Sequence, residues 1–518
     1  MRICVAGERD TLRLIAEKYG FPLNAIIPIN PHISHKDLQI PGTIVHLPEQ
    51  PAFTSESVPL PFCAPAIPAK TMDQWLPLTP LAEMEQTEYD VLIIGTGAGG
   101  SAALWRLCEK LGTTNKRIGV IERGNLLLPS HALNVPTLRN WSLMLQYYYN
   151  PRITYPLGKT LPEFPGARQV FALGGRTLFW GFTSVRTPSF EFVNWPISYK
   201  ELETYYNIAE QVMGVSLNST PFNEVLLRRL WEGGYPESQL TPNAITYGAL
   251  NVFFSSIVFI GEALRHRAFD LAVNARAIQL VTEQGTISGV RVKSNNTPYL
   301  LKAKSVVVAG STFETPRLLL HSKIPGKSIG HYLTTHSYLK SDGNIIQQNA
   351  TEGEVSLLIP QTEQRPYQFK ITGGREVVSL DVSGRVQSRY ENRVYLDHDK
   401  KDEFGVPMIQ VNFSYSQADQ IVMQHMENEL RRVASVMEVS IPKNNCFWPP
   451  GYDNHDFGTC RMGDDHSTSV TNRYGQVHNI PGLYVADSSV MPSIGAVNPM
   501  LTIVALAIRT ADHILGRV

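Results

Sequence analysis

The most informative pattern in the chain is a continuous apolar run that leads into a glycine-rich turn. Residues 91–94 are all apolar, which is typical of a strand buried on both faces of a parallel sheet. The next six residues, 95–100, include four glycines. Small and apolar residues then recur at helical spacing over 102–111, and a second apolar run occupies 118–121. This order predicts a β-α-β unit.

Further strands are predicted later in the chain. Residues 305–310 form another apolar run that leads into a helical pattern over 315–319. Apolar and polar residues alternate over 375–382 and 393–397, which favours strands of a mixed sheet. A short apolar strand at 482–487 ends in an acid. Strands and helices thus alternate, and the predicted fold class is α/β.

The first 48 residues have a pattern of their own. Apolar residues at 3 and 5 suggest a short strand, and an apolar face over 12–19 predicts a helix. Turn residues then precede a closing strand at 43–47. These elements predict a small strand–helix–helix–strand unit.

This small unit resembles the LysM module, a fold that binds N-acetylglucosamine glycans such as peptidoglycan or chitin. In one respect it departs from that module: Gly7 is separated from Asp10 by two residues, whereas the glycine usually comes directly before the aspartate. Glycan binding and a packing or tethering role therefore both stay open. The matching residues are Asp10-Thr11-Leu12, Ile15-Ala16, Tyr19-Gly20, Asn30-Pro31, Pro41-Gly42 and Leu47-Pro48.

Residues 49–87 are predicted to be a linker. Seven prolines between Pro51 and Pro80 favour a stiff, extended segment. Phe53, Phe62 and Trp75 suggest that this segment lies on the next domain.

Composition narrows the possible partners and compartment. Basic and acidic residues number 46 each, so the formal net charge is zero and no nucleic-acid partner is expected. Five scattered cysteines indicate a reducing compartment. The first residues contain no apolar signal core, so we expect a cytoplasmic protein, with cell-surface association through residues 1–48 as an alternative. The longest near-apolar stretch, 247–264, contains polar residues and predicts a buried or lid segment, with no membrane span.

The glycine turn fits the G-x-G-x-x-G pattern of dinucleotide-binding sites. It follows a predicted strand and opens a predicted helix, which is the context that gives the pattern its meaning. Gly95 permits the tight turn, Gly97 lets the backbone approach a pyrophosphate, and Gly100 lets the helix pack on the strand. The helix N-terminus offers free N–H groups to the phosphates. Thr96 and Gly99 complete the predicted contacts.

Two acids indicate which dinucleotide is bound. Glu122, followed by Arg123, ends the second strand, where a carboxylate accepts hydrogen bonds from ribose hydroxyls and repels a 2′-phosphate. Asp487 ends the short C-terminal strand, as in flavoproteins whose chain returns to the FAD domain. The acid is then expected near the ribityl or phosphate part of the flavin. These features favour FAD over NAD.

Five ordered segments together resemble the glucose–methanol–choline (GMC) oxidoreductase family, over about residues 88–518. The stretch 174–180 is most similar to pyranose-oxidase-like members. The resemblance implies oxidation of an alcohol with FAD. The segments are Gly95–Gly100, Gly174-Gly175-Arg176-Thr177 with Trp180, Ala309-Gly310 with Thr315-Pro316-Arg317, His455–Gly463, and Asp487–Thr502.

The same resemblance assigns the site residues. His455 lies in a segment that matches the His-x-x-Gly-Thr-Cys motif of the family, and it is expected to be the general base. Asn498 is its expected partner, although Asn-Pro also marks turns. A base with a pKa near the working pH assists removal of the hydroxyl proton. Further cofactor contacts are expected at Gly174, Gly175, Thr177, Trp180, Ala277, Asn498, Pro499 and Met500.

Two residues depart from pyranose oxidases. Phe179 stands where some of those enzymes bind FAD covalently through a histidine, so non-covalent FAD is predicted. Gly181 stands where they carry a threonine near the flavin, which leaves the reaction with oxygen open. The aromatic stretch Trp141 to Tyr149 is expected to pack in the core or a lid, and His336 is expected to be structural. No metal site is predicted, because His32 and His35 lack further ligands.

The predicted function is oxidation of a secondary alcohol, on a sugar or glycoside, with oxygen or a quinone as electron acceptor. Two alternatives remain: a lyase that uses FAD without redox chemistry, and a glycan-tethered protein that acts mainly through residues 1–48. The expected domains are a Rossmann-like FAD-binding domain built from residues 88–190, 265–335 and 446–518, and a mixed-sheet substrate domain built from 191–264 and 336–445.

Overall fold

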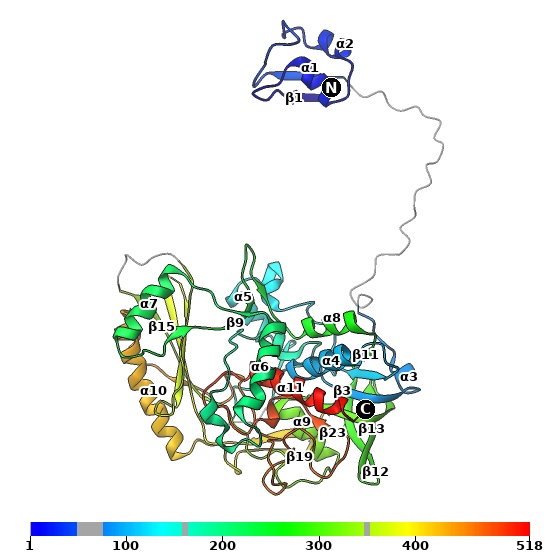
Figure 1. Cartoon of the computed structure of the whole chain (residues 1–518), viewed down its shortest axis with the longest axis vertical. Helices are drawn as coiled ribbons and strands as arrows, with labels where there is room; N and C mark the ends of the chain where they lie inside the picture. The colour runs from blue at the N-terminus through cyan, green and yellow to red at the C-terminus, as the bar shows by residue number, and fades with distance from the viewer. Residues whose placement is uncertain (1, 49–75, 158–163, 347–352, 375, 518) are drawn as a thin grey trace. The chain divides into compact units, whose positions relative to one another are not determined.

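The chain divides into two compact units, residues 1–70 and 71–518 (Figure 1). The predicted contacts of Phe53, Phe62 and Trp75 lie outside the described residues. The computed structural model describes residues 2–48, 76–157, 164–346, 353–374 and 376–517.

The first unit has the predicted order of strand, helix, helix and strand. Strand β1 (Arg2–Val5) pairs antiparallel with β2 (Ile44–Leu47). Between them lie α1 (Leu12–Lys18) and α2 (Leu23–Ile26). Helix α1 begins after Thr11, whose hydroxyl caps the first turn. The buried core is formed by Ala6, Leu12, Ile15, Ala16, Ile26, Val45 and Leu47.

The second unit contains two seven-stranded sheets, of which the first includes the predicted β-α-β unit. Its strand order is β11-β4-β3-β14-β13-β12, and β23 also pairs with β14. The pairs among β11, β4, β3, β14 and β23 are parallel, whereas β14, β13 and β12 form an antiparallel meander. The bounds are β3 (Glu88–Ile94), β4 (Ile118–Ile121), β11 (Asp270–Ala272), β12 (Arg276–Glu283), β13 (Thr286–Ser294), β14 (Thr297–Val308) and β23 (Leu483–Val485).

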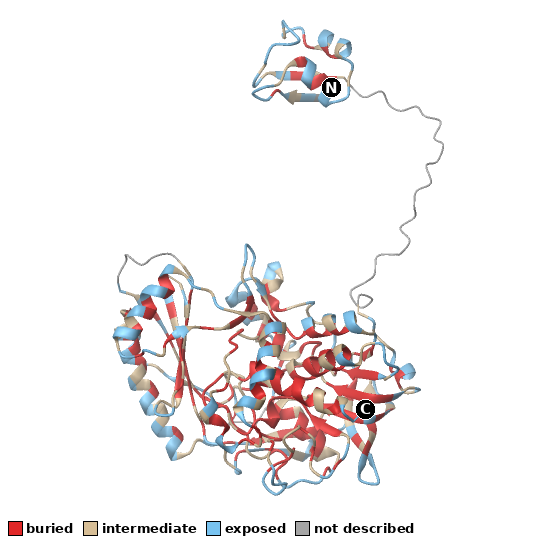
Figure 2. Ribbon diagram, viewed as in Figure 1, coloured by how far each residue is buried: buried red, intermediate tan, exposed pale blue. Residues whose placement is uncertain are grey.

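Helices cover this first sheet. Helix α4 (Ala98–Leu111) follows the glycine turn and packs against α8 (Ile257–His266) and α11 (Met500–Leu515). Helix α11 packs in turn against α6 (Tyr199–Met213). The residues of β3 and β4 are almost all buried, as expected for parallel strands covered on both faces (Figure 2).

The second sheet is antiparallel and has two different faces. Its order is β21-β15-β18-β17-β16-β8, with β22 also paired to β15. Helices α7 (Pro221–Glu232) and α10 (Gln417–Val436) close an apolar core against one face (Figure 1). The bounds are β8 (Gln239–Leu240), β15 (Ser337–Ile345), β16 (Val355–Ile359), β17 (Tyr367–Gly373), β18 (Val377–Gly384), β21 (Val439–Ser440) and β22 (Phe447–Trp448).

Smaller elements complete the second unit. The hairpin β19–β20 packs on α9, which follows β14 as predicted. Among the described residues, no helix is long and apolar enough to cross a membrane. The bounds are α3 (Leu81–Met84), α5 (Trp141–Tyr148), α9 (Ser311–His321), β5 (Thr154–Pro156), β6 (Arg168–Val170), β7 (Val215–Ser216), β9 (Asn243–Thr246), β10 (Val252–Phe253), β19 (Arg393–Lys401) and β20 (Pro407–Asn412).

Two predicted segment boundaries differ from the structure. The end of the predicted linker forms α3, whose Met84 is fully buried in the core of the first sheet. The predicted substrate segment 191–264 is divided between two cores. Helices α6 and α8 pack with the first sheet, because their apolar faces meet α11 and α4, whereas α7 packs on the second sheet. Apolar periodicity predicts the buried face of a helix but does not say which partner covers it.

Candidate active site

The glycine turn connects β3 to α4, and its glycines differ in their surroundings. A Cβ atom on Gly99 would overlap the carbonyl oxygen of Ala486, which follows β23. A Cβ atom on Gly100 would overlap the carbonyl oxygen of Gly95. In contrast, nothing lies within 4 Å of the Cβ position of Gly97, which caps α4. The turn is therefore packed closely at 99 and 100 and open at 97.

The carboxylate of Glu122 holds this turn. It accepts hydrogen bonds from the Thr96 backbone N–H at 3.0 Å, the Thr96 hydroxyl at 2.6 Å and the Gly124 N–H at 2.8 Å. Burial raises the pKa of Glu122, and these donors oppose that rise. The acid thus ties the end of β4 to the turn after β3.

A second glycine segment lies against the first. Gly174 and Gly175 both have positive φ, 92° and 53°, in the region that favours glycine. The Gly174 N–H donates to the Thr96 hydroxyl at 3.1 Å. The nearest atom to a Cβ on Gly175 would be the Cα of Gly97, at 3.5 Å. The structure therefore brings together two predicted cofactor segments that are 78 residues apart.

Four further predicted cofactor residues lie on neighbouring segments. The Thr177 hydroxyl donates to Gly174 O at 2.6 Å, and the Trp180 indole N–H donates to Phe254 O at 2.8 Å. The Arg123 guanidinium lies 3.5 Å from the centre of the Phe171 ring. Ala277 lies at the start of β12, two residues after Ala275, whose N–H donates to Glu122 O at 2.8 Å.

Asp487 is held by protein groups on both oxygens. Oδ1 accepts hydrogen bonds from the Ser489 N–H at 2.9 Å and its hydroxyl at 2.6 Å. Oδ2 accepts from the Ser311 N–H at 2.9 Å and the Thr315 hydroxyl at 2.5 Å. Asp487 thus joins the end of β23 to the start of α9, and its predicted flavin contact stays a prediction.

His455 and Asn498 meet, although 43 residues separate them. The Asn498 amide Nδ2 lies 3.2 Å from His455 Nε2. The other end of the amide, Oδ1, accepts a hydrogen bond from Gln368 Nε2 at 3.0 Å. Since an amide nitrogen can only donate, Asn498 Nδ2 donates to His455 Nε2. Pro499 and Met500 follow directly and begin α11.

Two residues without a predicted catalytic role flank the opposite nitrogen of His455. His455 Nδ1 lies 3.1 Å from His336 Nδ1 and 3.2 Å from Asp453 Oδ2. Burial would raise the pKa of Asp453, but the facing imidazoles outweigh burial and lower it far below its usual range. Burial also lowers the pKa of His336, which favours its neutral form. The sequence signal for Asp453 is its position two residues before His455.

The same three side chains also converge closely enough to hold a metal ion. Their donor atoms lie within 4.8 Å of one another, and they are the one such group in the described part of the chain. No metal site was expected here from the sequence.

Arg176 links the glycine segment to the histidine loop. Its guanidinium donates to Asp456 Oδ2 at 2.9 Å, and Asp456 is fully buried beside His455. Burial raises the pKa of Asp456 to about 6 despite this ion pair, and the nearby charge of Asp453 contributes to the rise.

Family models for GMC oxidoreductases match residues 255–338 and 387–507 of the chain. Over these two segments the chain is similar to GMC oxidoreductases. It is an FAD-dependent oxidoreductase that acts on CH–OH groups, and FAD is its cofactor. The resemblance to this family that the sequence predicted is supported over these two segments.

Several relatives of this chain act on sugars or glycosides according to their names. A C-glycoside 3-oxidase of Arthrobacter globiformis is 26% identical over 391 residues, which cover 68% of this chain and 75% of that protein. Paromamine 6'-oxidase of Streptomyces fradiae is 24% identical, over 83% of this chain and 91% of its own length. Pyranose 2-oxidase of Tricholoma matsutake is 23% identical, over 68% and 74%.

Solved structures share the fold. A formate oxidase of Aspergillus oryzae superposes with a TM-score of 0.65 at 15% identity and covers 83% of this chain and 98% of that chain. A pyridoxine 4-oxidase superposes with a TM-score of 0.62, also at 15% identity, over 82% and 99%. At this identity the likeness concerns the fold alone.

The residues of the glycine turn fit FAD. Gly97 leaves open space beside the N-terminus of α4, where free N–H groups can face a pyrophosphate. The second glycine segment lies beside this helix end, because the Cα of Gly97 is 3.5 Å from the Cβ position of Gly175.

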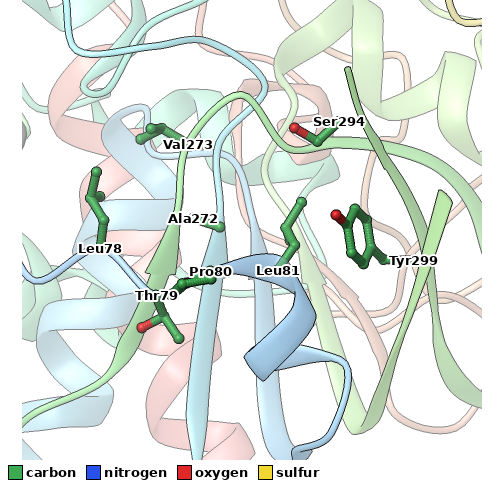
Figure 3. Close-up of a pocket in the computed structure, with 8 residues that line it drawn as sticks. All are labelled: Leu78, Thr79, Pro80, Leu81, Ala272, Val273, Ser294 and Tyr299. Carbon is green, nitrogen blue, oxygen red and sulfur yellow. The ribbon is translucent and has the colours of Figure 1, made fainter. Parts of the chain in front are cut away.

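A pocket elsewhere in the second unit contains none of these residues (Figure 3). Its lining side chains come from the segment before β3 and from strands of the first sheet. It holds no histidine, carboxylate or basic group, so it offers no acid–base chemistry at neutral pH. The lining residues are Leu78, Thr79, Pro80, Leu81, Ala272, Val273, Ser294 and Tyr299.

Proposed function

We propose that this enzyme oxidises a secondary alcohol of a sugar or glycoside to a ketone, with His455 as the base. The observation that carries the proposal is the contact of His455 Nε2 with Asn498 Nδ2 at 3.2 Å, in a chain that uses FAD. The names of relatives that oxidise C-glycosides, pyranoses and paromamine support the substrate class.

Oxidation of an alcohol breaks its O–H bond and one C–H bond, and His455 and Asn498 act on the hydroxyl group in this step. The substrate hydroxyl donates its proton to His455 Nε2, and the Asn498 amide then donates to the substrate oxygen. As the proton leaves, the carbon releases a hydride and its oxygen becomes a carbonyl. FAD, when bound, supplies the acceptor for that hydride. Asn498 orients the oxygen without adding charge.

Asp453 and His336 favour the tautomer of His455 that can act as a base. The negative charge of Asp453, 3.2 Å from His455 Nδ1, favours a proton on that nitrogen. His336 Nδ1 lies 3.1 Å from the same nitrogen and can accept a hydrogen bond from it. A neutral imidazole with its proton on Nδ1 keeps its lone pair on Nε2. That lone pair faces the Asn498 amide in this structure and accepts the substrate proton once the substrate hydroxyl lies between the two side chains.

FAD is proposed to be held without a covalent bond. Contacts to its phosphates are assigned to Gly95, Thr96, Gly97, Gly99 and Gly100, and ribose contacts to Glu122. Phe179 is buried, 8% exposed, and carries no group that could form a flavin bond. Dissociation of the flavin on acid precipitation, with a colourless protein pellet, is the expected result.

The test is anaerobic titration of the holoenzyme with D-glucose, D-galactose and their methyl glycosides. Bleaching of the flavin band indicates hydride transfer, whereas product formation without bleaching would support the lyase alternative. His455→Ala should lower the rate of bleaching by about 100-fold or more. His466→Ala, whose side chain is 73% exposed, is the control and should leave the rate unchanged. Equal rates in the His455 variant would overturn the assignment of the base.

The electron acceptor is proposed to be oxygen or a quinone. Gly181 gives no side chain to favour either one. Mixing the reduced enzyme with oxygen or with benzoquinone and following the return of the flavin band distinguishes an oxidase from a dehydrogenase.

A glycan is proposed as a second partner, through residues 1–48. The observation in favour is the strand–helix–helix–strand order of the first unit, with β1 paired to β2. The protein would then act at a surface that carries N-acetylglucosamine.

A further inference from the structure

The second sheet turns a polar face toward the catalytic segments. Along β17, Phe369 and Ile371 belong to the apolar core of this sheet, so Gln368 and Lys370 project from the opposite face. Gln368 Nε2 donates to Asn498 Oδ1 at 3.0 Å. The Lys370 ammonium donates to Gly181 O at 3.3 Å. This face therefore reaches both the catalytic pair and the segment that follows Trp180.

Lys370 lies beside a carboxylate on the same face. Asp381 of β18 is directly opposite Lys370 in the strand register, and Lys340 Nζ approaches it from β15 at 3.7 Å. Tyr338 also lies on this face, and burial together with the charge of Asp381 raises its pKa well above the usual value. The face thus carries donors and an acceptor in neighbouring strands.

Several of these polar groups have unused hydrogen-bonding capacity. Asp381 Oδ1 and Gln368 Oε1 are buried and have no hydrogen-bond partner among the described residues. An ammonium group can donate three hydrogen bonds, and Lys370 makes one to Gly181. Leaving buried polar groups unpaired is costly, so such groups indicate a ligand that completes them.

We propose that Lys370 and Asp381 bind hydroxyl groups of the substrate that are remote from the oxidised carbon. This inference rests on the proposed oxidation of a sugar or glycoside. Lys370 lies two residues from Gln368, about 6.6 Å along the strand, which is a span suited to the opposite sides of a six-membered ring. The ammonium donates to one hydroxyl and the carboxylate accepts from another. Such a pair of groups suits a ring that carries several hydroxyls.

The test combines variants with substrate analogues. The saccharide among D-glucose, D-galactose and their methyl glycosides that reduces the flavin fastest is compared with its monodeoxy analogues. Rates of anaerobic flavin reduction are measured for wild type, Lys370→Met, Lys370→Arg and Asp381→Asn. The control is Lys400→Met on the β19–β20 hairpin, because Lys400 is 57% exposed. Flavin content and thermal melting establish that each variant is folded.

Lys370→Met and Asp381→Asn should each lower the second-order rate of reduction about 10- to 100-fold with the full saccharide, as expected for a hydrogen bond to a charged group. For one ring position remote from the oxidised carbon, the deoxy analogue should reduce the wild-type flavin more slowly than the full saccharide, by a similar factor. In the variant, the deoxy analogue and the full saccharide should reduce the flavin at the same rate. Lys370→Arg should keep part of the rate, and the control should keep all of it.

Two other outcomes separate this inference from the proposed function. If losses from the variants and from every deoxy analogue simply multiply, the pair is structural and the inference is overturned, while sugar oxidation stands. If none of the four saccharides bleaches the wild-type flavin but simple alcohols do, the proposed substrate class fails, and this inference fails with it.

Discussion

Asp453 is the side chain whose charge acts most directly on His455. Asp453→Asn removes the negative charge but keeps the shape of the side chain, so a proton on His455 Nδ1 is no longer favoured. We expect the rate of flavin reduction to fall about 100-fold or more, by analogy with the loss of the buried acid in other histidine bases. The measurement is anaerobic stopped-flow reduction with a saccharide that bleaches the wild type.

Asp465→Asn is the matched control for Asp453, because Asp465 is 59% exposed and lies in a nearby loop. It should leave the rate unchanged. A rate equal to wild type in Asp453→Asn, at normal flavin content, would show that Asp453 does not set the proton position.

Asp456 predicts a dependence of stability on pH. Burial raises the pKa of Asp456 to about 6, above its unfolded value near 3.8. A raised carboxyl pKa means that the folded state holds its proton longer, so stability falls as pH rises from about 4 to about 6. The loss is about 3 kcal/mol when complete. Asp456→Asn should therefore lose less stability than wild type between pH 4 and pH 7, as measured by chemical denaturation of the apoprotein. Parallel losses in both proteins would contradict this.

At the scale of elements, two glycines of the turn are expected to have different roles. Gly99 serves packing, whereas Gly97 serves cofactor binding. Gly99→Ala places a methyl group on the backbone of Ala486, so α4 must shift from the end of β23. We expect the apoprotein to lose about 1–3 kcal/mol of stability, the usual cost of overpacking. The measurement is the denaturation midpoint of the apoprotein.

Gly97→Ala is the matched comparison in the same turn. Because nothing lies within 4 Å of its Cβ position, apoprotein stability should stay near wild type. FAD affinity should nevertheless fall, since the methyl group occupies the space assigned to the pyrophosphate. A normal FAD affinity in this variant would place the cofactor elsewhere.

The prediction of elements succeeded where the pattern was local. The apolar runs at 91–94 and 118–121 are strands β3 and β4, and the intervening helix is α4. The segment 191–264 was harder to assign, because the apolar face of an amphipathic helix such as α6 does not indicate which element packs against it. Its residues Leu202 and Tyr206 pack with the first sheet.

At the scale of the whole molecule, the first unit offers a test that is independent of the redox site. A chain without residues 1–48 should lose binding to insoluble chitin and peptidoglycan if this unit is a glycan-binding module. Flavin content and the rate of flavin reduction should stay unchanged, because the second unit holds all the predicted redox residues. Binding is measured by co-sedimentation. Undiminished binding of the shortened chain would end the glycan proposal.

The sequence alone predicted the glycine turn, the β-α-β unit, the resemblance to GMC oxidoreductases and the pair His455 and Asn498. The turn and the β-α-β unit depend on residues close together in the chain, where spacing reflects the period of a helix or strand. The resemblance and the pair instead rest on short motifs in five ordered segments. Only the tertiary structure joined His336 to His455, which are 119 residues apart, and placed Lys370 opposite Asp381 on a face that reaches Gly181. Such contacts depend on how sheets and loops pack together, and a local sequence pattern does not specify that packing.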